Sequence, residues 1–237
     1  MPTNFAVFAY PRTGSYHLVS LLNSARDVVC HGEIFKGGKV ELNKWHKRQF
    51  PGLSPDHRDQ NGKEFIEKLR SLNPHKHFGF KFFLDHAKRA DHLHTVMNSD
   101  AWKKIALVRD PVEVYASHIR ARKTSIWGVK VDREKPDDSL LNMQVDFTPE
   151  SWDGHVRHYA LFLQKVASLR NVIIARYGEY ATPEGLAPIL DFIGSRADPE
   201  TLQEGRVKQF TRSTQEAFSN WAEFQDYLAR KPAPAIP

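Results

Sequence analysis

A short loop near the N-terminus combines residue types that bind an oxyanion. Residues Pro11–Ser15 (PRTGS) follow an apolar run and precede a helical pattern, where backbone N–H groups are unpaired and attract negative charge. Arg12 offers a fork of donors to phosphate or sulfate oxygens, and Gly14 lets the backbone approach a ligand. The hydroxyls of Thr13 and Ser15 add donors. A plain strand-to-helix turn with a surface arginine is the alternative for the loop alone.

The loop differs from a Walker-type phosphate loop. GxxxxGK[ST] requires a second glycine and a lysine, and this loop has neither. This disfavours an ATPase or a GTPase and indicates a shorter phosphate loop of another kind.

A second arginine stands where open α/β sheets place their ligands. Arg109 follows the apolar run 104–108 (KIALV), at the predicted carboxyl end of a strand. Asp110 and Pro111 have the residue types of a helix N-cap and first turn, so Ser117, eight positions after Arg109, falls within a helix. Taken separately, the arginine could pair locally and the serine could bond to its own helix.

Together, the two segments resemble the PAPS-dependent sulfotransferases, whose sulfuryl donor is 3′-phosphoadenosine 5′-phosphosulfate (PAPS). The family's 5′-phosphosulfate loop has the form P-[KR]-[ST]-G-[ST], which Pro11–Ser15 matches. Its 3′-phosphate motif places an arginine eight positions before a serine, as in Arg109 and Ser117. The late segments Tyr177–Tyr180 (YGEY) and Leu190–Gly194 (LDFIG) are similar to the family's Y-E-D-L and L-x-F-L-G region.

Within the family, the resemblance is to carbohydrate sulfotransferases. Arg12 stands where enzymes acting on phenols and steroids have lysine. Ser117–Trp127 (SHIRARKTSIW) resembles the S-x-x-R-A-x-Q-T-G-x-W run of bacterial trehalose- and nodulation-factor-type enzymes, with Lys123 and Ser125 replacing Gln and Gly. The resemblance implies a three-layer, P-loop-like α/β fold with a mostly parallel sheet. It also implies PAPS as donor, no required metal, and a hydroxyl acceptor on a carbohydrate or other small alcohol.

The resemblance also suggests roles for residues outside the two motifs. Tyr16 extends the donor-binding loop. A glutamate just past the first helix is the base in related enzymes, which selects Glu33; His31 is the alternative base, and a structural ion pair is the alternative role for Glu33. Lys81, inside the apolar strand FGFKFF, is expected to face the reacting group rather than to reach solvent at a sheet end. His17 is a further candidate for contact with the sulfuryl group or the acceptor.

A late basic segment, 206–213, is expected to close over the nucleotide. Lys208 and Arg212 are its candidate phosphate contacts, with solvated charges as the alternative.

Histidines cluster in two places. These are His75 and His77, followed by His86, His92 and His94. They lack the cysteines or acidic spacing of a recognised metal site, so we interpret them as surface histidines and expect no metal.

Apolar periodicity predicts alternating strands and helices. The expected strands are 4–10, 78–83, 104–108 and 171–176; the expected helices are 15–24, a helix from Asp110 through Ile119, 152–169, 182–194 and 215–228. Such alternation favours helices packed on a mostly parallel sheet. The polar segment 35–61 is expected to be a surface excursion and, with 123–150, to shape the acceptor pocket.

Composition is that of a globular protein. The 237 residues are 41% hydrophobic and 26% charged, with a net charge of +6, and we expect one domain over 1–237. The single cysteine, Cys30, excludes an internal disulfide and is interpreted as a core residue. With no signal-like or membrane-spanning run, a cytoplasmic setting is expected. The basic residues are dispersed, which disfavours nucleic-acid binding; a small kinase with an atypical phosphate loop is the alternative enzyme class. The oligomeric state is left open.

Overall fold

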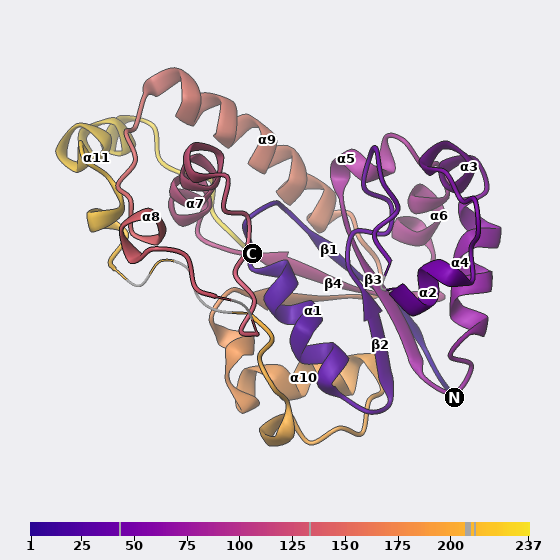
Figure 1. Ribbon diagram of the computed structural model, residues 1–237. Coiled ribbons are helices and arrows are strands. Elements are labelled where there is room, and N and C mark those ends of the chain that lie inside the picture. Colours follow the sequence, from indigo (N-terminus) through magenta and orange to yellow (C-terminus); the bar gives the residue numbers. More distant parts are fainter. Residues whose placement is uncertain (43, 133, 207–209, 211) are drawn as a thin grey trace.

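A parallel sheet forms the centre of the molecule (Figure 1). The computed structural model describes residues 1–42, 44–132, 134–206, 210 and 212–237. The sheet has the order β2-β3-β1-β4-β5, and every pairing in it is parallel. Its strands are β1 (Asn4–Ala9), β2 (Val28–His31), β3 (His77–Phe83), β4 (Trp102–Val108) and β5 (Val172–Arg176). The α/β architecture predicted from the sequence is confirmed.

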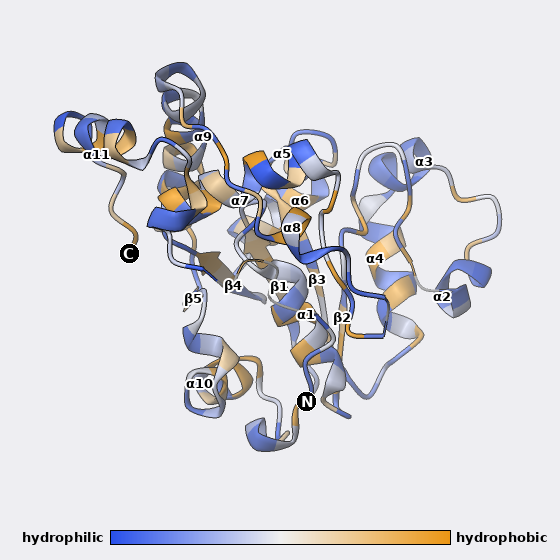
Figure 2. Cartoon of the chain, turned by 60° about the vertical axis from the view of Figure 1, so that its left-hand side comes forward, coloured by the Kyte–Doolittle hydropathy of each residue, from blue (hydrophilic) through white to orange (hydrophobic). Residues whose placement is uncertain are grey.

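Strand β1 lies in the middle of the sheet, and apolar clusters cover both of its faces. Phe5 and Val7 belong to one apolar cluster, which includes residues of α1 (Ser15–Ser24) and α10 (Pro183–Ile193). Phe8 belongs to the cluster on the other face, together with residues of α4 (Gly62–Ser71), α6 (His92–Asn98) and α9 (Pro149–Ala167). Successive side chains of a strand point to opposite faces, so one continuous apolar run fills two cores. Figure 2 shows hydrophobic colouring on β1 and β4 and on parts of α4 and α9.

A third apolar cluster lies at the end of the molecule where α7 (Pro111–Thr124), α9 and α11 (Trp221–Arg230) meet (Figure 1). Tyr115 and Trp152 pack there with Phe218 and Phe224. This cluster fixes α7, which carries the second sequence motif. The short helices are α2 (Lys44–Arg48), α3 (Pro55–Gln60), α5 (Leu84–Ala87) and α8 (Asp138–Leu141), with 3₁₀ turns at Glu179–Ala181, Pro199–Thr201 and Gln215–Ala217.

The predicted caps explain where several helices begin and end. Asp110 accepts hydrogen bonds from the amides of Val112 and Glu113 at the start of α7. Thr182 accepts from the amide of Gly185 at the start of α10, which ends at Gly194 in the left-handed conformation.

Other parts of the fold differ from the expectation. The segment 35–61 is not only a surface excursion, since it contains α2 and α3 and buries Phe35 and Arg58 completely. The tail helix begins at Trp221 rather than near 215, after a 3₁₀ turn. Strand β2 and helices α4 to α6 were not predicted. In the described residues, no helix is long and apolar enough to cross a membrane.

Candidate active site

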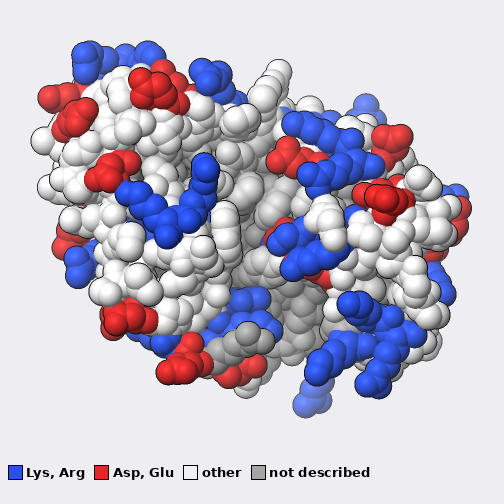
Figure 3. Space-filling view, turned by 45° about the horizontal axis from the view of Figure 1, so that its top comes forward, with Lys and Arg blue, Asp and Glu red and all other residues white. Residues whose placement is uncertain are grey.

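A cavity of about 870 Å³ opens at the carboxyl ends of β1, β3 and β4. In Figure 3, Lys and Arg side chains border a hollow in the middle of one face. The cavity brings together most of the predicted site residues. These are Arg12, Gly14, Ser15, Tyr16, His17, Glu33, Lys81, Arg109, Ser117 and Arg212.

The loop between β1 and α1 has an unusual backbone. Arg12 has φ 73° and Gly14 has φ 84°, a left-handed region that is costly for most residues. A Cβ on Gly14 would lie 2.5 Å from the Tyr177 ring and from the Tyr180 hydroxyl, so only glycine fits. Helix α1 has no side-chain cap, so its first amides are available to an anion.

The two sequence motifs meet at this loop. The Arg12 Nε donates a hydrogen bond to the Ser117 Oγ at 3.0 Å, and the Arg109 Nη1 donates to the Arg12 carbonyl oxygen at 3.1 Å. Arg109 also pairs with Glu113 at 2.8 Å, and its guanidinium lies 3.9 Å from the centre of the Tyr177 ring. Segments about a hundred residues apart therefore form one cationic wall.

Positive charge on this wall exceeds its local compensation. Burial, followed by repulsion from Arg109 and Arg120, lowers the pKa of Arg12 to about 10. Burial and Arg109 likewise lower the pKa of Arg120 to about 10. An anion bound between these guanidinium groups would relieve the repulsion, because each charged hydrogen bond to it favours the protonated form.

A buried ion pair between Glu33 and Lys81 lies at the cavity. The Lys81 Nζ donates to the Glu33 Oε1 at 2.8 Å, and the Lys81 side chain is fully buried. Burial lowers the pKa of Lys81 to about 8, against the opposing influence of Glu33. The second oxygen, Glu33 Oε2, lies 3.8 Å from both Lys36 Nζ and His86 Nε2. The pair thus joins a loop after β2 to a residue of the neighbouring strand β3.

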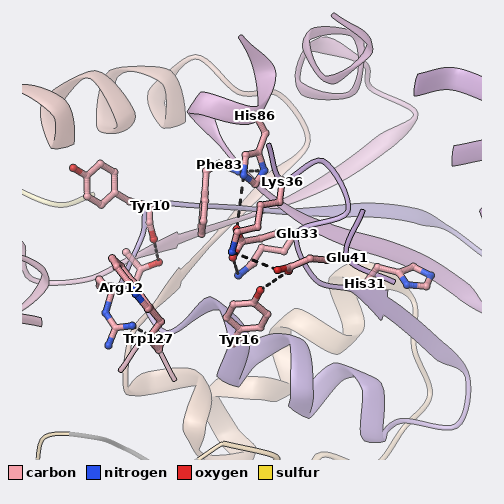
Figure 4. Close-up of polar contacts among 12 residues, drawn as sticks. Tyr10, Arg12, Tyr16, His31, Glu33, Lys36, Glu41, Phe83, His86 and Trp127 are labelled. Carbon is pink, nitrogen blue, oxygen red and sulfur yellow. Dashed lines mark hydrogen bonds and ion pairs between the residues drawn. The ribbon is translucent and has the colours of Figure 1, made fainter. Parts of the chain in front are cut away.

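Tyr16 connects this pair to a second carboxylate. Its ring centre lies 3.2 Å from the Lys81 Nζ, and its hydroxyl donates to the Glu41 Oε2 at 2.9 Å (Figure 4). Burial, then the negative charges of Glu33 and Glu41, raises the pKa of Tyr16. Tyr16 therefore stays neutral and packs its ring against the ammonium group.

The remaining predicted residues take different positions. The His17 Nε2 lies 3.1 Å from the Glu204 Oε1 at the cavity edge. Thr13 is buried, and its hydroxyl donates to the Tyr10 carbonyl at 2.7 Å, so its side chain turns back into the loop. His31 packs against His46, with ring centres 4.7 Å apart, and is not among the residues that line the cavity.

Burial and His46 lower the pKa of His31 to about 3. Arg212 lines the cavity, whereas Lys208 lies outside the described residues.

Three residues of the cavity were not singled out from the sequence, although Arg120 lies in the run 117–127 and Arg206 in the segment 206–213. Arg120, Arg206 and Lys36 line it, and Arg206 places its guanidinium 5.0 Å from the Tyr16 ring centre. The i,i+3 spacing from Ser117 to Arg120 on one helix face was the available signal for Arg120.

The expectation of surface histidines is wrong for His86. It is 5% exposed, its Nδ1 accepts from the Phe83 amide at 3.3 Å, and its Nε2 faces Glu33. Its backbone partner lies three residues away, and Glu33 comes from another strand's loop, so local spacing could not reveal this position. Among the described residues, no group of three or more His, Cys, Asp or Glu side chains is placed to hold a metal ion.

Comparisons with known proteins agree with this geometry. No family model matches the chain. It is 24% identical to Nodulation protein H of Rhizobium tropici over 245 aligned positions, covering 98% of this chain and 91% of that protein. A sulfotransferase from Alicyclobacillus acidocaldarius superposes with a TM-score of 0.50 at 13% identity, covering 97% and 92% of the two chains. The sulfotransferase domain of the curacin biosynthetic pathway superposes with a TM-score of 0.48 at 17% identity, covering 95% of this chain and 86% of that one.

The parallel sheet and the strand–loop–helix unit at β1 and α1 define a P-loop-like α/β protein, and the structural likeness shows that its fold is that of the sulfotransferases. The near-full-length likeness to Nodulation protein H, at 24% identity, adds a sequence relative to this likeness in fold.

Proposed function

We propose that the protein transfers a sulfuryl group from PAPS to a hydroxyl group of a carbohydrate or other small alcohol. The observation that carries this proposal is the Arg12–Ser117 hydrogen bond, which joins both donor-binding motifs at one cavity. The same cavity holds the Glu33–Lys81 pair, so anion binding and acid–base groups coincide.

Donor binding is assigned to the cationic wall. The α1 amides, Arg12, Gly14 and Ser15 would hold the 5′-phosphosulfate, since the helix start and the arginine fork both favour an anion. Arg109 and Ser117 would hold the 3′-phosphate. Arg212 and the neighbouring Lys208 are proposed to add charge as the late segment meets the nucleotide.

The transfer itself needs a base and a way to stabilise the leaving group. In this proposal Glu33 takes the acceptor hydroxyl's proton while that oxygen bonds to sulfur and the bond from sulfur to the 5′-phosphate oxygen breaks. The electrons of the broken bond stay on the phosphate, and Lys81 with the α1 amides stabilises that charge. A pKa near 8 keeps most Lys81 side chains protonated at pH 7. His17, at the cavity edge, is proposed to contact the sulfuryl group or the acceptor.

The acceptor end is built from the two variable segments. Segment 35–61 contributes Lys36 to the cavity, and segment 123–150 contributes apolar groups such as Trp127 and Leu141. A mixed polar and apolar wall suits a sugar ring or a small alcohol, which has hydroxyl groups and apolar faces. One domain, no required metal and a cytoplasmic setting belong to the same proposal.

A PAPS turnover assay tests the proposal. We expect PAP (3′,5′-bisphosphoadenosine) to form in the presence of one member of a panel of sugars, glycolipids and small alcohols. Glu33→Gln and Arg109→Ala should each abolish most of this turnover. The control Lys63→Met, on the exposed face of α4, should leave it unchanged. Normal turnover in both site variants would remove the site assignment.

A thermal-shift measurement separates this function from a small kinase. PAP alone should raise the melting temperature, because ligand that binds only the folded state stabilises it. If ATP with magnesium raised the melting temperature and PAP did not, the kinase would replace the sulfotransferase.

A further inference from the structure

Arg120 is a third arginine on the wall that Arg12 and Arg109 form. It lies on α7 one turn after Ser117, lines the cavity, and is 7% exposed. Its Nε donates to the Met143 carbonyl at 2.7 Å, and its guanidinium lies 3.9 Å from the centre of the Phe210 ring. These contacts hold the plane of the guanidinium in one orientation.

One nitrogen of this guanidinium has no hydrogen-bond partner among the described residues. Its Nη2 is buried and makes no hydrogen bond within the described part of the chain, where it also has no carboxylate at ion-pair distance. Arg109, by contrast, pairs with Glu113 at 2.8 Å. Burying a polar group without a partner is costly, and burying an uncompensated charge is more so. An unpartnered donor on a residue that lines the cavity is therefore best explained by a ligand that accepts from it.

The position of Arg120 favours the 3′ side of the nucleotide. Residues three apart share a helix face, so Ser117 and Arg120 present their side chains to the same region. Arg120 also lies close enough to Arg109 for repulsion between the two charges to add to burial in lowering the Arg120 pKa. A phosphate has enough oxygens to accept from a serine and two arginines at once.

We propose that Arg120 binds an oxygen of the donor's 3′-phosphate beside Arg109 and Ser117, and that it sets the preference for a nucleotide carrying that phosphate. This inference rests on the proposed PAPS binding. It adds a specificity-determining residue that neither phosphate motif contains.

Calorimetric titration with two nucleotides tests it. PAP carries the 3′-phosphate, and adenosine 5′-monophosphate lacks it. Arg120→Met keeps the length of the side chain against Phe210 but removes the donors. We expect PAP to bind this variant at least about tenfold more weakly, which corresponds to one lost charge-assisted hydrogen bond, while the affinity for adenosine 5′-monophosphate changes less than about twofold.

Two further variants secure the interpretation. Arg120→Lys keeps the charge and should recover part of the affinity for PAP. Arg122→Met removes an exposed arginine from the same helix and should bind both nucleotides as the parent does. Near-ultraviolet circular dichroism and melting curves confirm that each variant is folded before titration.

Two results would overturn the role of Arg120 alone: unchanged PAP affinity in a folded Arg120→Met variant, or equal weakening of both nucleotides. Absence of PAP binding to the unaltered protein would instead overturn the proposed function, and this inference with it.

Discussion

Replacing either member of the Glu33–Lys81 pair should lower the free energy of unfolding, but by different amounts for the two residues. In Lys81→Met, a 6% exposed carboxylate loses the ammonium group 2.8 Å away. Removing one partner of a buried pair costs about 3–5 kcal/mol. Lys36 and His86, each 3.8 Å from the other Glu33 oxygen, place this variant near the lower end, about 3 kcal/mol.

Replacing Glu33 instead should cost less, because a buried lysine that has lost its carboxylate partner can release its proton. In Glu33→Gln, Lys81 begins from a pKa of about 8, one unit above pH 7. Protonation of Lys81 therefore contributes only about 1 kcal/mol at pH 7, and this bounds the penalty of losing its charge. This penalty is smaller than the cost of about 3 kcal/mol expected for Lys81→Met. Lys81→Met should thus destabilise more than Glu33→Gln.

Urea denaturation at pH 7 of both single variants and the double variant measures the difference. The double variant should be more stable than Lys81→Met alone, because the uncompensated carboxylate is gone. Lys63→Met, which breaks an exposed pair at 4.0 Å, should change the free energy of unfolding by less than about 0.5 kcal/mol. Equal cost of the two single variants, or additive cost in the double variant, would refute the reasoning.

Three further predictions concern pH, backbone and thiol. Because folding lowers the pKa of Lys81 to about 8, the unfolded chain binds more protons between about pH 8 and its ordinary value near 10.4. The Lys81 contribution to the free energy of unfolding should therefore rise with pH across that window. By contrast, kcat/KM should fall above about pH 8 as Lys81 loses its proton, and Lys81→Arg should move this fall to higher pH. If the pH of the fall did not move in Lys81→Arg, another group would be responsible for it. Gly38→Ala, at positive φ but with nothing within 4 Å, should lower the free energy of unfolding only by the backbone strain, about 1–3 kcal/mol. Gly14→Ala should lower it further and remove most PAP affinity, because its Cβ would also meet Tyr177 and Tyr180. Equal effects would exclude this close approach as the cause. Burial raises the pKa of the Cys30 thiol, so an aromatic disulfide reagent should label it only as the chain unfolds; rapid labelling of the folded protein would contradict the burial.

The sequence predicted those elements whose signals are local. Asp110 and Thr182 cap their helices as their residue types indicate, and the apolar runs of β1, β3, β4 and β5 form strands. Strand β2 was missed because Val28–His31 is four residues long and follows a helix closely, so periodicity has little to act on. A short strand of this kind is fixed by its pairing with β3 rather than by its own pattern.

The residues of the site divide in the same way. Arg12, Gly14 and Ser15 could be predicted because a strand–loop–helix unit is local in sequence. Arg58, which supports the site without lining the cavity, could not be predicted: its Nη1 donates to the carbonyl oxygens of Ile34, Lys36 and Lys39, at 3.0, 3.1 and 2.9 Å. These bonds span roughly twenty residues, and only the folded chain brings the arginine to the loop that follows Glu33. A charged residue in a polar segment is usually exposed, so composition pointed the other way.

Charge is distributed unequally between the two ends of the cavity. At the acceptor end, Glu33 faces Lys81, and Lys36 lies between Glu33 and Glu41, so the charges there nearly balance. On the cationic wall, Arg109 forms an ion pair with Glu113, while Arg120 donates a hydrogen bond to a backbone carbonyl oxygen. The excess positive charge therefore lies where phosphate groups are proposed to bind, and the balanced pair lies where a single proton must move. In the proposed function, this separation lets the cationic wall hold the donor's phosphates while the Glu33 carboxylate remains available to the acceptor hydroxyl.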